Sequence, residues 1–85
     1  MSFKQIHAIG ASYVKIDGAL VRELHRDDVA VAKVRALHSV CQAAGMQTIA
    51  EFVEEPETLE KLRSMGVNFA QGFGVSKPAP LSELE

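Results

Sequence analysis

The sequence is short of several residue types, and each shortage excludes a class of protein. Its one cysteine, Cys41, excludes an internal disulfide and a zinc cluster held by cysteines. Nine Lys and Arg against 11 Asp and Glu give a net charge of −2, without the basic stripe that DNA or RNA binding requires. No apolar run approaches the roughly 18–20 residues of a membrane span, and the first residues lack the apolar core of a signal peptide. We therefore expect a soluble protein of a reducing compartment.

Chain length sets a second limit. A chain of 85 residues buries only about 60–65% of its unfolded surface, which permits one small domain over residues 1–85 and excludes two. Hydrophobic residues make up 47% of the chain and charged residues 24%, which is typical of a globular domain and not of a disordered one.

Short apolar runs, each preceded by a glycine, predict three strands. They are Tyr13–Ile16, Thr48–Ala50 and Val67–Ala70. Their apolar character is nearly continuous, which is typical of strands that are buried on both faces, as in a parallel sheet.

Helical patterns lie between these strands. Residues 28–44 repeat apolar side chains at spacings of three and four, and residues 56–65 begin with a proline, which suits the first helical position. Residues 18–24 suit a short helical turn, and apolar spacing of three over residues 3–9 predicts the end of a further helix. Strands joined through helices predict right-handed crossovers, and therefore an α/β fold with about three strand–helix units of parallel sheet.

Polar residues occur where each predicted strand ends. Lys15 and Asp17 close the first strand, Glu51 the second and Gln71 the third, and counting from the preceding glycine puts the Lys, Glu and Gln at matching heights. Ligands of parallel α/β folds bind outside the carboxyl ends of the strands. One such residue alone would more often cap a helix or hydrogen-bond a neighbouring polar group. We expect Asp17 to hydrogen-bond the following turn. Three in register favour a binding site, without indicating its substrate.

Four short motifs accompany these strand ends. They are Lys15-Ile16-Asp17, the run from Ala50 to Glu54 (AEFVE), Gln71-Gly72-Phe73 and Ser76-Lys77-Pro78. Together they resemble the last third of the EAL domain, the family of bacterial cyclic di-GMP phosphodiesterases. The run from Leu59 to Gly66 is also similar to the helix that precedes the last strand of that family. The resemblance covers essentially the whole chain.

This resemblance implies a modified TIM barrel whose active site holds two divalent cations, Mg²⁺ or Mn²⁺. The family hydrolyses one phosphodiester bond of cyclic di-GMP to give linear pGpG, and two metals suit this chemistry because they stabilise both the attacking and the leaving oxygen. The motifs imply that Lys15 lies beside the attacking water and stabilises charge on the phosphate. They imply that Glu51 is a metal ligand or a base, and that Gln71 holds a water or a phosphate oxygen.

Lesser roles are implied at three further positions. Phe52 corresponds to a residue next to a substrate guanine. Glu54 is a candidate for substrate binding because it belongs to the same motif as Glu51. It is a weaker candidate than Glu51, since an acidic residue at such a position is more often simply solvated. Pro80 is a candidate for contact with a bound base. The family also implies a bacterial protein of the cytoplasm.

The sequence departs from the family in what precedes these motifs. It lacks the Glu-Ala-Leu signature, the Asn and Glu of the middle strands, and the Asp-Asp-Phe-Gly loop, which supply most of the metal ligands. Asp27-Asp28 is not that loop, because Val and Ala follow it and it comes after Lys15. A TIM barrel needs about 250 residues, so this chain supplies about a third of one. We expect the start of the chain to lie just past that loop, and little or no hydrolysis by the chain alone.

Two interpretations stay open at this point. In the first, the chain is the C-terminal segment of a phosphodiesterase that hydrolyses cyclic di-GMP as an intact protein. In the second, it is a degenerate, non-catalytic module that binds cyclic di-GMP or another protein. An unrelated small α/β domain is a remote third. In either main case a slice of a barrel exposes two parallel strand edges, so we expect association with the remainder of the barrel or with further copies.

Overall fold

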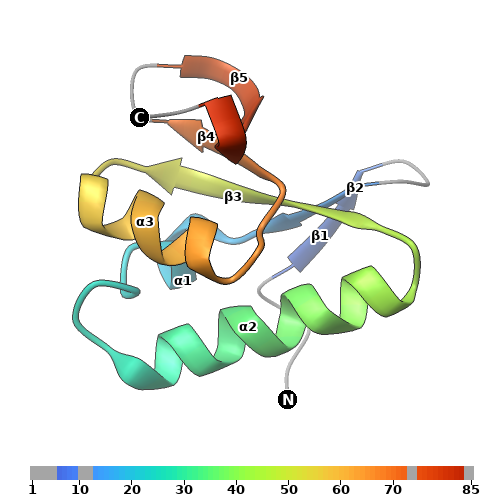
Figure 1. The fold of residues 1–85 in the computed structure, drawn as a ribbon, viewed down its shortest axis with the longest axis horizontal. Helices are drawn as coiled ribbons and strands as arrows, with labels where there is room; N and C mark the ends of the chain where they lie inside the picture. The colour runs from blue at the N-terminus through green and yellow to red at the C-terminus, as the bar shows by residue number, and fades with distance from the viewer. Residues whose placement is uncertain (1–5, 10–12, 73–74, 84–85) are drawn as a thin grey trace.

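A computed structural model describes residues 6–9, 13–72 and 75–83. These residues form one five-stranded sheet in the order β1-β2-β3-β4-β5 (Figure 1). The strands are β1 (Ile6–Ile9), β2 (Tyr13–Ile16), β3 (Gln47–Val53), β4 (Phe69–Gly72) and β5 (Val75–Pro80). Strands β2, β3 and β4 are parallel neighbours, which confirms the three predicted strands and their parallel pairing.

The two outer strands were not predicted. β1 pairs antiparallel with β2, so the helix expected over residues 3–9 is wrong for residues 6–9, while residues 3–5 lie outside the described residues. A run of three apolar residues is too short to separate a helical period from a strand. β5 pairs antiparallel with β4, and its prolines lie in an edge strand, where a missing N–H costs least.

These outer strands also change the expected edges of the sheet. The parallel strands β2 and β4 are covered by β1 and β5, so the expectation of two open parallel edges is wrong. Within the described residues, the edges of the sheet belong to two short antiparallel strands. Open strand edges therefore give a weaker reason for association than the sequence suggested.

The helices begin and end where local signals predict. They are α1 (Gly18–Val21), α2 (Asp28–Ala43), α3 (Pro56–Ser64) and the 3₁₀ turn η2 (Leu81–Glu83). Oδ1 of Asp17 accepts from the backbone N–H of Ala19 at 3.2 Å, and Oδ1 of Asp27 accepts from that of Val29 at 2.9 Å, so both aspartates cap helices. Gly45 follows α2 with a φ of 76°, the left-handed conformation that ends a helix cheaply only at glycine.

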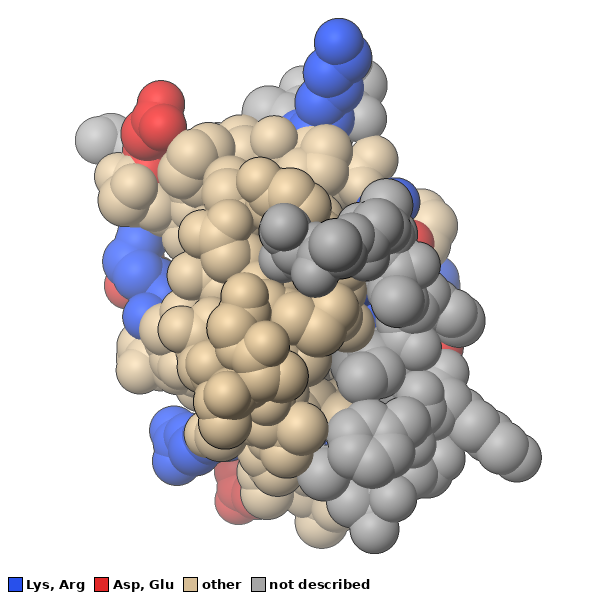
Figure 2. All heavy atoms as spheres, turned by 90° about the vertical axis from the view of Figure 1, so that its right-hand side faces the viewer, with Lys and Arg blue, Asp and Glu red and all other residues tan. Residues whose placement is uncertain are grey.

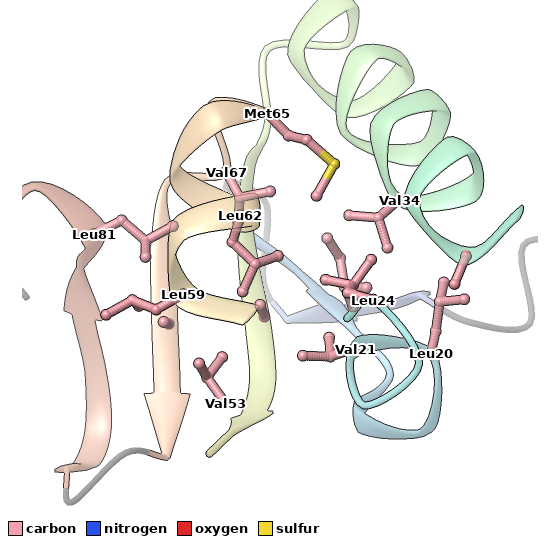
Figure 3. Packing of buried hydrophobic residues seen from close by; sticks show 14 of the residues in the cluster. Leu20, Val21, Leu24, Val34, Val53, Leu59, Leu62, Met65, Val67 and Leu81 are labelled. Carbon is pink, nitrogen blue, oxygen red and sulfur yellow. The ribbon is translucent and has the colours of Figure 1, made fainter. Parts of the chain in front are cut away.

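One hydrophobic core lies between the sheet and the helices. Buried side chains from all three helices meet side chains from one face of the strands, as Figure 3 shows for 14 of them. The fully buried members with the largest side chains include Ile16, Val21, Leu24, Val34, Leu37, Val53, Leu59 and Leu62. Within the part of the chain that the structure describes, the helices therefore cover one face of the sheet. No described helix is long and apolar enough to cross a membrane.

Charged side chains are sparse at the end of the molecule where β2 and β3 begin. Figure 2 looks onto this end, which is the right-hand side of Figure 1, and the described Lys, Arg, Asp and Glu atoms lie toward its margins. The polar residues singled out from the sequence belong to the opposite end, where the parallel strands finish.

Candidate functional site

Lys15, Glu51 and Gln71 extend from the face of the sheet that the helices leave uncovered. Side chains alternate along a strand, and Ile16, Ala50 and Ala70 belong to the core under the helices, so the residues before or after them point to the other face. All three candidate residues are half-buried. In a TIM barrel the uncovered face is the barrel interior, where the strands finish at the active site.

The three residues do not stand at one height, as counting from the glycines suggested. Lys15 pairs with Ile49, which in turn pairs with Phe69, so Lys15 is level with residues two positions before Glu51 and Gln71. That offset is about 6–7 Å along a strand, which the long side chain of lysine can span. The count from a preceding glycine was misleading because the residues that pair across the three strands come at different distances in sequence after their glycines.

An apolar hollow surrounds Lys15 on this face. Tyr13, Lys15, Ile49, Phe69 and Pro78 line a space of about 410 Å³. The rings of Tyr13 and Phe69 meet edge to face, with centroids 5.8 Å apart and planes at 65°. Tyr13 and Phe69 were not among the predicted site residues, although the alternation of Tyr13 with Lys15 along one strand would have placed Tyr13 on this face. Apart from Lys15, the side chains that line this hollow are apolar or aromatic.

A bulge interrupts β3 at Glu51. The register runs from Ala50 opposite Ala70 to Val53 opposite Gly72, so Glu51 and Phe52 together oppose Gln71. Ala50 and Val53 are both fully buried in the core, three positions apart, which regular alternation would not allow. The extra residue is Phe52, whose φ is 56°. Bulges of this kind often re-aim a side chain beside an active site.

Phe52 lies away from the hollow around Lys15. Its ring packs against α1, with the guanidinium carbon of Arg22 5.3 Å from the ring centroid, and 53% of the residue is exposed. Phe52 and Glu54 line a second, smaller hollow of about 240 Å³ with residues of the segment that follows α1 and of the start of α3. The structure therefore brings Phe52 and Glu54 together, at the carboxyl end of the sheet but beside the helices.

Pro80 lies on a different level from Glu51 and Gln71. Pro80 of β5 pairs with Phe69 of β4. Phe69 pairs with Ile49, and Ile49 pairs with Lys15, so Pro80 is level with Lys15 across the sheet. Phe73 of the third motif lies outside the described residues. Contact of Pro80 or Phe52 with a bound base stays a prediction.

Other polar and titratable groups lie apart from this face. Asp17 caps α1, as expected. Burial lowers the pKa of the His38 imidazole and raises the pKa of the Cys41 thiol. Both residues belong to α2 and are buried. A buried thiol with a raised pKa is a poor nucleophile.

The described part of the chain does not by itself fit a two-metal centre. It contains no group of three or more His, Cys, Asp or Glu side chains that could hold a metal ion. Of the described candidates, Glu51 is the carboxylate at the strand ends on the uncovered face. Divalent cations such as Mg²⁺ need about six oxygen ligands, of which only some can be waters. Glu51 therefore suits one ligand position, and the remaining protein ligands would have to come from other segments.

Comparison with known proteins identifies the family. The family model described as EAL domain matches residues 1–78. The chain belongs to the EAL domain family. The cyclic di-GMP phosphodiesterase PdeB of Shewanella oneidensis is 37% identical over 81 residues, which are 95% of this chain and 10% of PdeB. The cyclic di-GMP phosphodiesterase PdeR of Escherichia coli is 36% identical over 84 residues, which are 99% of this chain and 13% of PdeR.

A solved structure agrees with this assignment. BlrP1 of Klebsiella pneumoniae, solved as a complex with manganese and cyclic di-GMP, superposes with a TM-score of 0.72 at 32% identity. The match covers 86% of this chain and 19% of BlrP1. Such EAL structures are barrels of the TIM type, so the expected α/β fold, a partial barrel, is confirmed, and the chain corresponds to the C-terminal part of the domain. The chain spans only about a tenth of the length of the curated relatives it matches.

Proposed function

We propose that this chain forms one side of the active site of a cyclic di-GMP phosphodiesterase, which hydrolyses cyclic di-GMP to pGpG as a complete EAL barrel. The observation that carries the proposal is that Lys15, Glu51 and Gln71 extend from the uncovered face of three adjacent parallel strands, near the strands' carboxyl ends. The relatives' activity supports the choice of substrate.

Each residue suits a distinct task in phosphodiester hydrolysis. Attack of water on phosphorus builds negative charge on the phosphate oxygens, and the Lys15 ammonium can neutralise that charge. Closing the barrel over these apolar neighbours would strengthen the effect, because a charge acts over a longer range where water is excluded. Gln71 can hold a water or a phosphate oxygen through its amide. Glu51 can accept a proton from water or serve as one ligand of Mg²⁺ or Mn²⁺, which when bound would stabilise charge on the phosphate.

The remaining strands of the EAL barrel are the partner that this function requires. Tyr13, Ile49 and Phe69 belong to a face that the chain's own helices do not cover. Closing the barrel would bury these apolar side chains and would bring further carboxylates to Glu51. A second copy of the chain is the alternative cover for this face. Since the substrate is a bacterial nucleotide, we place the protein in the bacterial cytoplasm, with no role in DNA or RNA binding.

Hydrolysis tests this proposal directly. The 85-residue chain is compared with a complete EAL domain that carries it as the C-terminal part, in Mg²⁺ or Mn²⁺ buffer, with pGpG measured by chromatography. We expect the complete domain to form pGpG and the isolated chain to form little or none. Lys15→Ala and Glu51→Gln in the complete domain should each lower kcat by about 100-fold or more, while Lys77→Ala, an exposed lysine of β5, serves as the control. A complete domain without activity, or with full activity after Lys15→Ala, contradicts the proposal.

A non-catalytic role is the second candidate. The described residues lack a cluster of metal ligands but retain Lys15, Glu51 and Gln71, which is the pattern expected of a cyclic di-GMP receptor or interaction module. Calorimetry of the 85-residue chain with cyclic di-GMP, with and without Mg²⁺, tests it. Binding without hydrolysis by the complete domain would favour the receptor, and no heat at high micromolar ligand would exclude that role for this chain.

A further inference from the structure

Phe52 has an unusual backbone conformation. Among the described residues it is the one non-glycine residue with a positive φ, at 56°. This left-handed region is sparsely populated by residues that carry a Cβ, and a bulky residue persists there only when its surroundings hold it. The residue follows Glu51 directly, at the bulge of β3.

Two glycines make room for this conformation. A Cβ on Gly18, the first residue of α1, would lie only 2.0 Å from Cδ2 of the Phe52 ring. A Cβ on Gly72 would lie 2.7 Å from the carbonyl oxygen of Val53 and 2.8 Å from its nitrogen. The φ of Gly18 is not in the left-handed region, so the ring of Phe52 is the reason that this position needs glycine. Gly18 is buried, and the ring lies directly over it.

Arg22 also contacts the ring. Its guanidinium carbon lies 5.3 Å from the ring centroid, within the range of a cation–π contact. Gly18 and Arg22 are one helical turn apart, and the backbone N–H of Arg22 donates to the carbonyl of Gly18 at 2.9 Å. The ring of Phe52 therefore meets both the first residue of α1 and the residue that caps its C-terminal end.

The bulge determines on which face Glu51 lies. Val53 is fully buried in the core together with Ala50, and Phe52 is the extra residue that allows both to point under the helices. Without a left-handed residue at position 52, regular alternation could keep only one of the two on the core face. Retaining Val53 in the core would then turn Glu51 toward the helices and away from Lys15.

We propose that Gly18, Phe52 and Arg22 form a clamp that holds the bulge of β3 and thereby positions Glu51. In this inference, which rests on the proposed function, Phe52 is a positioning residue that acts through its backbone, and this role replaces the contact with a substrate guanine that the family resemblance implies. The clamp makes α1 part of the active-site support. The requirement for glycine at position 18 follows from the phenylalanine at position 52.

Substitutions at position 52 separate the backbone from the ring. In the complete EAL domain, Phe52→Ala removes the ring but keeps a Cβ that disfavours the left-handed conformation, whereas Phe52→Gly removes the ring and adopts that conformation freely. We expect Phe52→Ala to lower kcat and the calorimetric affinity for Mn²⁺ by about 10–100-fold, with KM unchanged, because Glu51 is displaced. Phe52→Gly should stay within about threefold of the parent in both quantities, as the backbone is preserved. If the ring instead contacts the substrate, both variants raise KM equally, and the proposal is wrong.

A second pair of variants tests the clash at Gly18. Gly18→Ala should lower kcat by about tenfold or more in the Phe52 background, because its Cβ would displace the ring, and should have little effect together with Phe52→Gly. Arg22→Ala should have a smaller effect of the same kind, with Arg35→Ala on α2 as the matched control. Equal effects of Gly18→Ala in both backgrounds would overturn the clamp.

A readout that needs no activity keeps the two proposals apart. Amide hydrogen exchange of residues 50–53 in the metal-free domain should be faster in Phe52→Ala than in the parent and near the parent's rate in Phe52→Gly. An inactive parent domain would refute the proposed phosphodiesterase, while the exchange rates would still decide the clamp. Whether or not the parent domain is active, equal exchange rates in Phe52→Ala and Phe52→Gly would refute the clamp.

Discussion

Nδ1 of His38 lies 2.8 Å from Oγ1 of Thr48, and both side chains are buried, with 8% and 0% exposed. Oδ1 of Asn68 accepts from the backbone N–H of Thr48 at 3.0 Å and from Nε2 of Gln42 at 3.2 Å. These contacts join α2, β3 and the segment before β4 at the end of the sheet opposite the candidate site. Buried polar groups that satisfy one another in this way specify how elements pack.

The free energy of unfolding should fall as the pH is lowered below about 6.5, the ordinary pKa of histidine. Burial lowers the pKa of His38, so below that pH the unfolded chain binds a proton that the folded chain resists, and acid favours unfolding. Above that pH the imidazole is neutral in both states and the dependence disappears. Urea unfolding from pH 5 to pH 8 measures this. His38→Gln should flatten the profile. An unchanged profile in His38→Gln would contradict the assignment.

Thr48→Val should destabilise the fold by about 1–3 kcal/mol, because it removes the hydroxyl that His38 meets and leaves a buried polar atom without its partner. The two side chains have nearly the same shape, so little packing is lost. Thr48→Ser keeps the hydroxyl and is the matched control. The difference in urea midpoint between the two variants is the measurement, and equal midpoints would show that the hydrogen bond contributes nothing.

Asp27→Ala should cost about 0.5–2 kcal/mol of stability, because Oδ1 of Asp27 accepts from the N–H of Val29 and caps the long helix α2. Asp27→Ser preserves an oxygen acceptor and should restore most of the loss. Asp28→Ala removes a first-turn carboxylate without removing the cap, and should cost only a few tenths of a kcal/mol. Thermal unfolding followed by circular dichroism ranks the three. A larger loss in Asp28→Ala than in Asp27→Ala would mean that the cap lies elsewhere.

Tyr13→Lys should weaken association of the chain with copies of itself or with the rest of the barrel. Tyr13 lies on the uncovered face with its ring against Phe69, and a charge there would have to be desolvated when the face is covered. Analytical ultracentrifugation of the 85-residue chain over a range of concentrations measures the change. Val29→Lys, at an exposed apolar residue of α2, is the control. A parent chain that stays monomeric at millimolar concentration would refute the predicted association.

Local signals accounted for most of the helices and for the parallel strands. The boundaries of α2 and α3 follow from apolar spacing, from the cap at Asp27 and from Pro56, all of which act within a few residues. The motifs around Lys15, Glu51 and Gln71 were sufficient to indicate the EAL family before any geometry was known, and the family match supports that interpretation. The roles of these residues stay predictions.

Long-range contacts account for what the sequence did not reveal. β1 and β5 are strands because β2 and β4 offer them unpaired backbone groups, and a short apolar run or a proline-rich segment does not indicate such a partner. The offset of Lys15 from Glu51 depends on the register between two strands that are more than 30 residues apart. The ring of Phe52 over Gly18 depends on how α1 meets β3.

The amino-acid sequence by itself determined the family, the type of the main elements and which side chains carry charge to the strand ends, because these depend on residue identity and on spacing within one element. Only the tertiary structure decided the face on which each candidate lies, the bulge that turns Glu51 away from the core and the outer strands that cover the parallel edges. The reason is physical. Side-chain direction in a sheet reverses with every residue, so a single extra residue such as Phe52 changes which side chains share a face, and only packing between distant segments selects that residue.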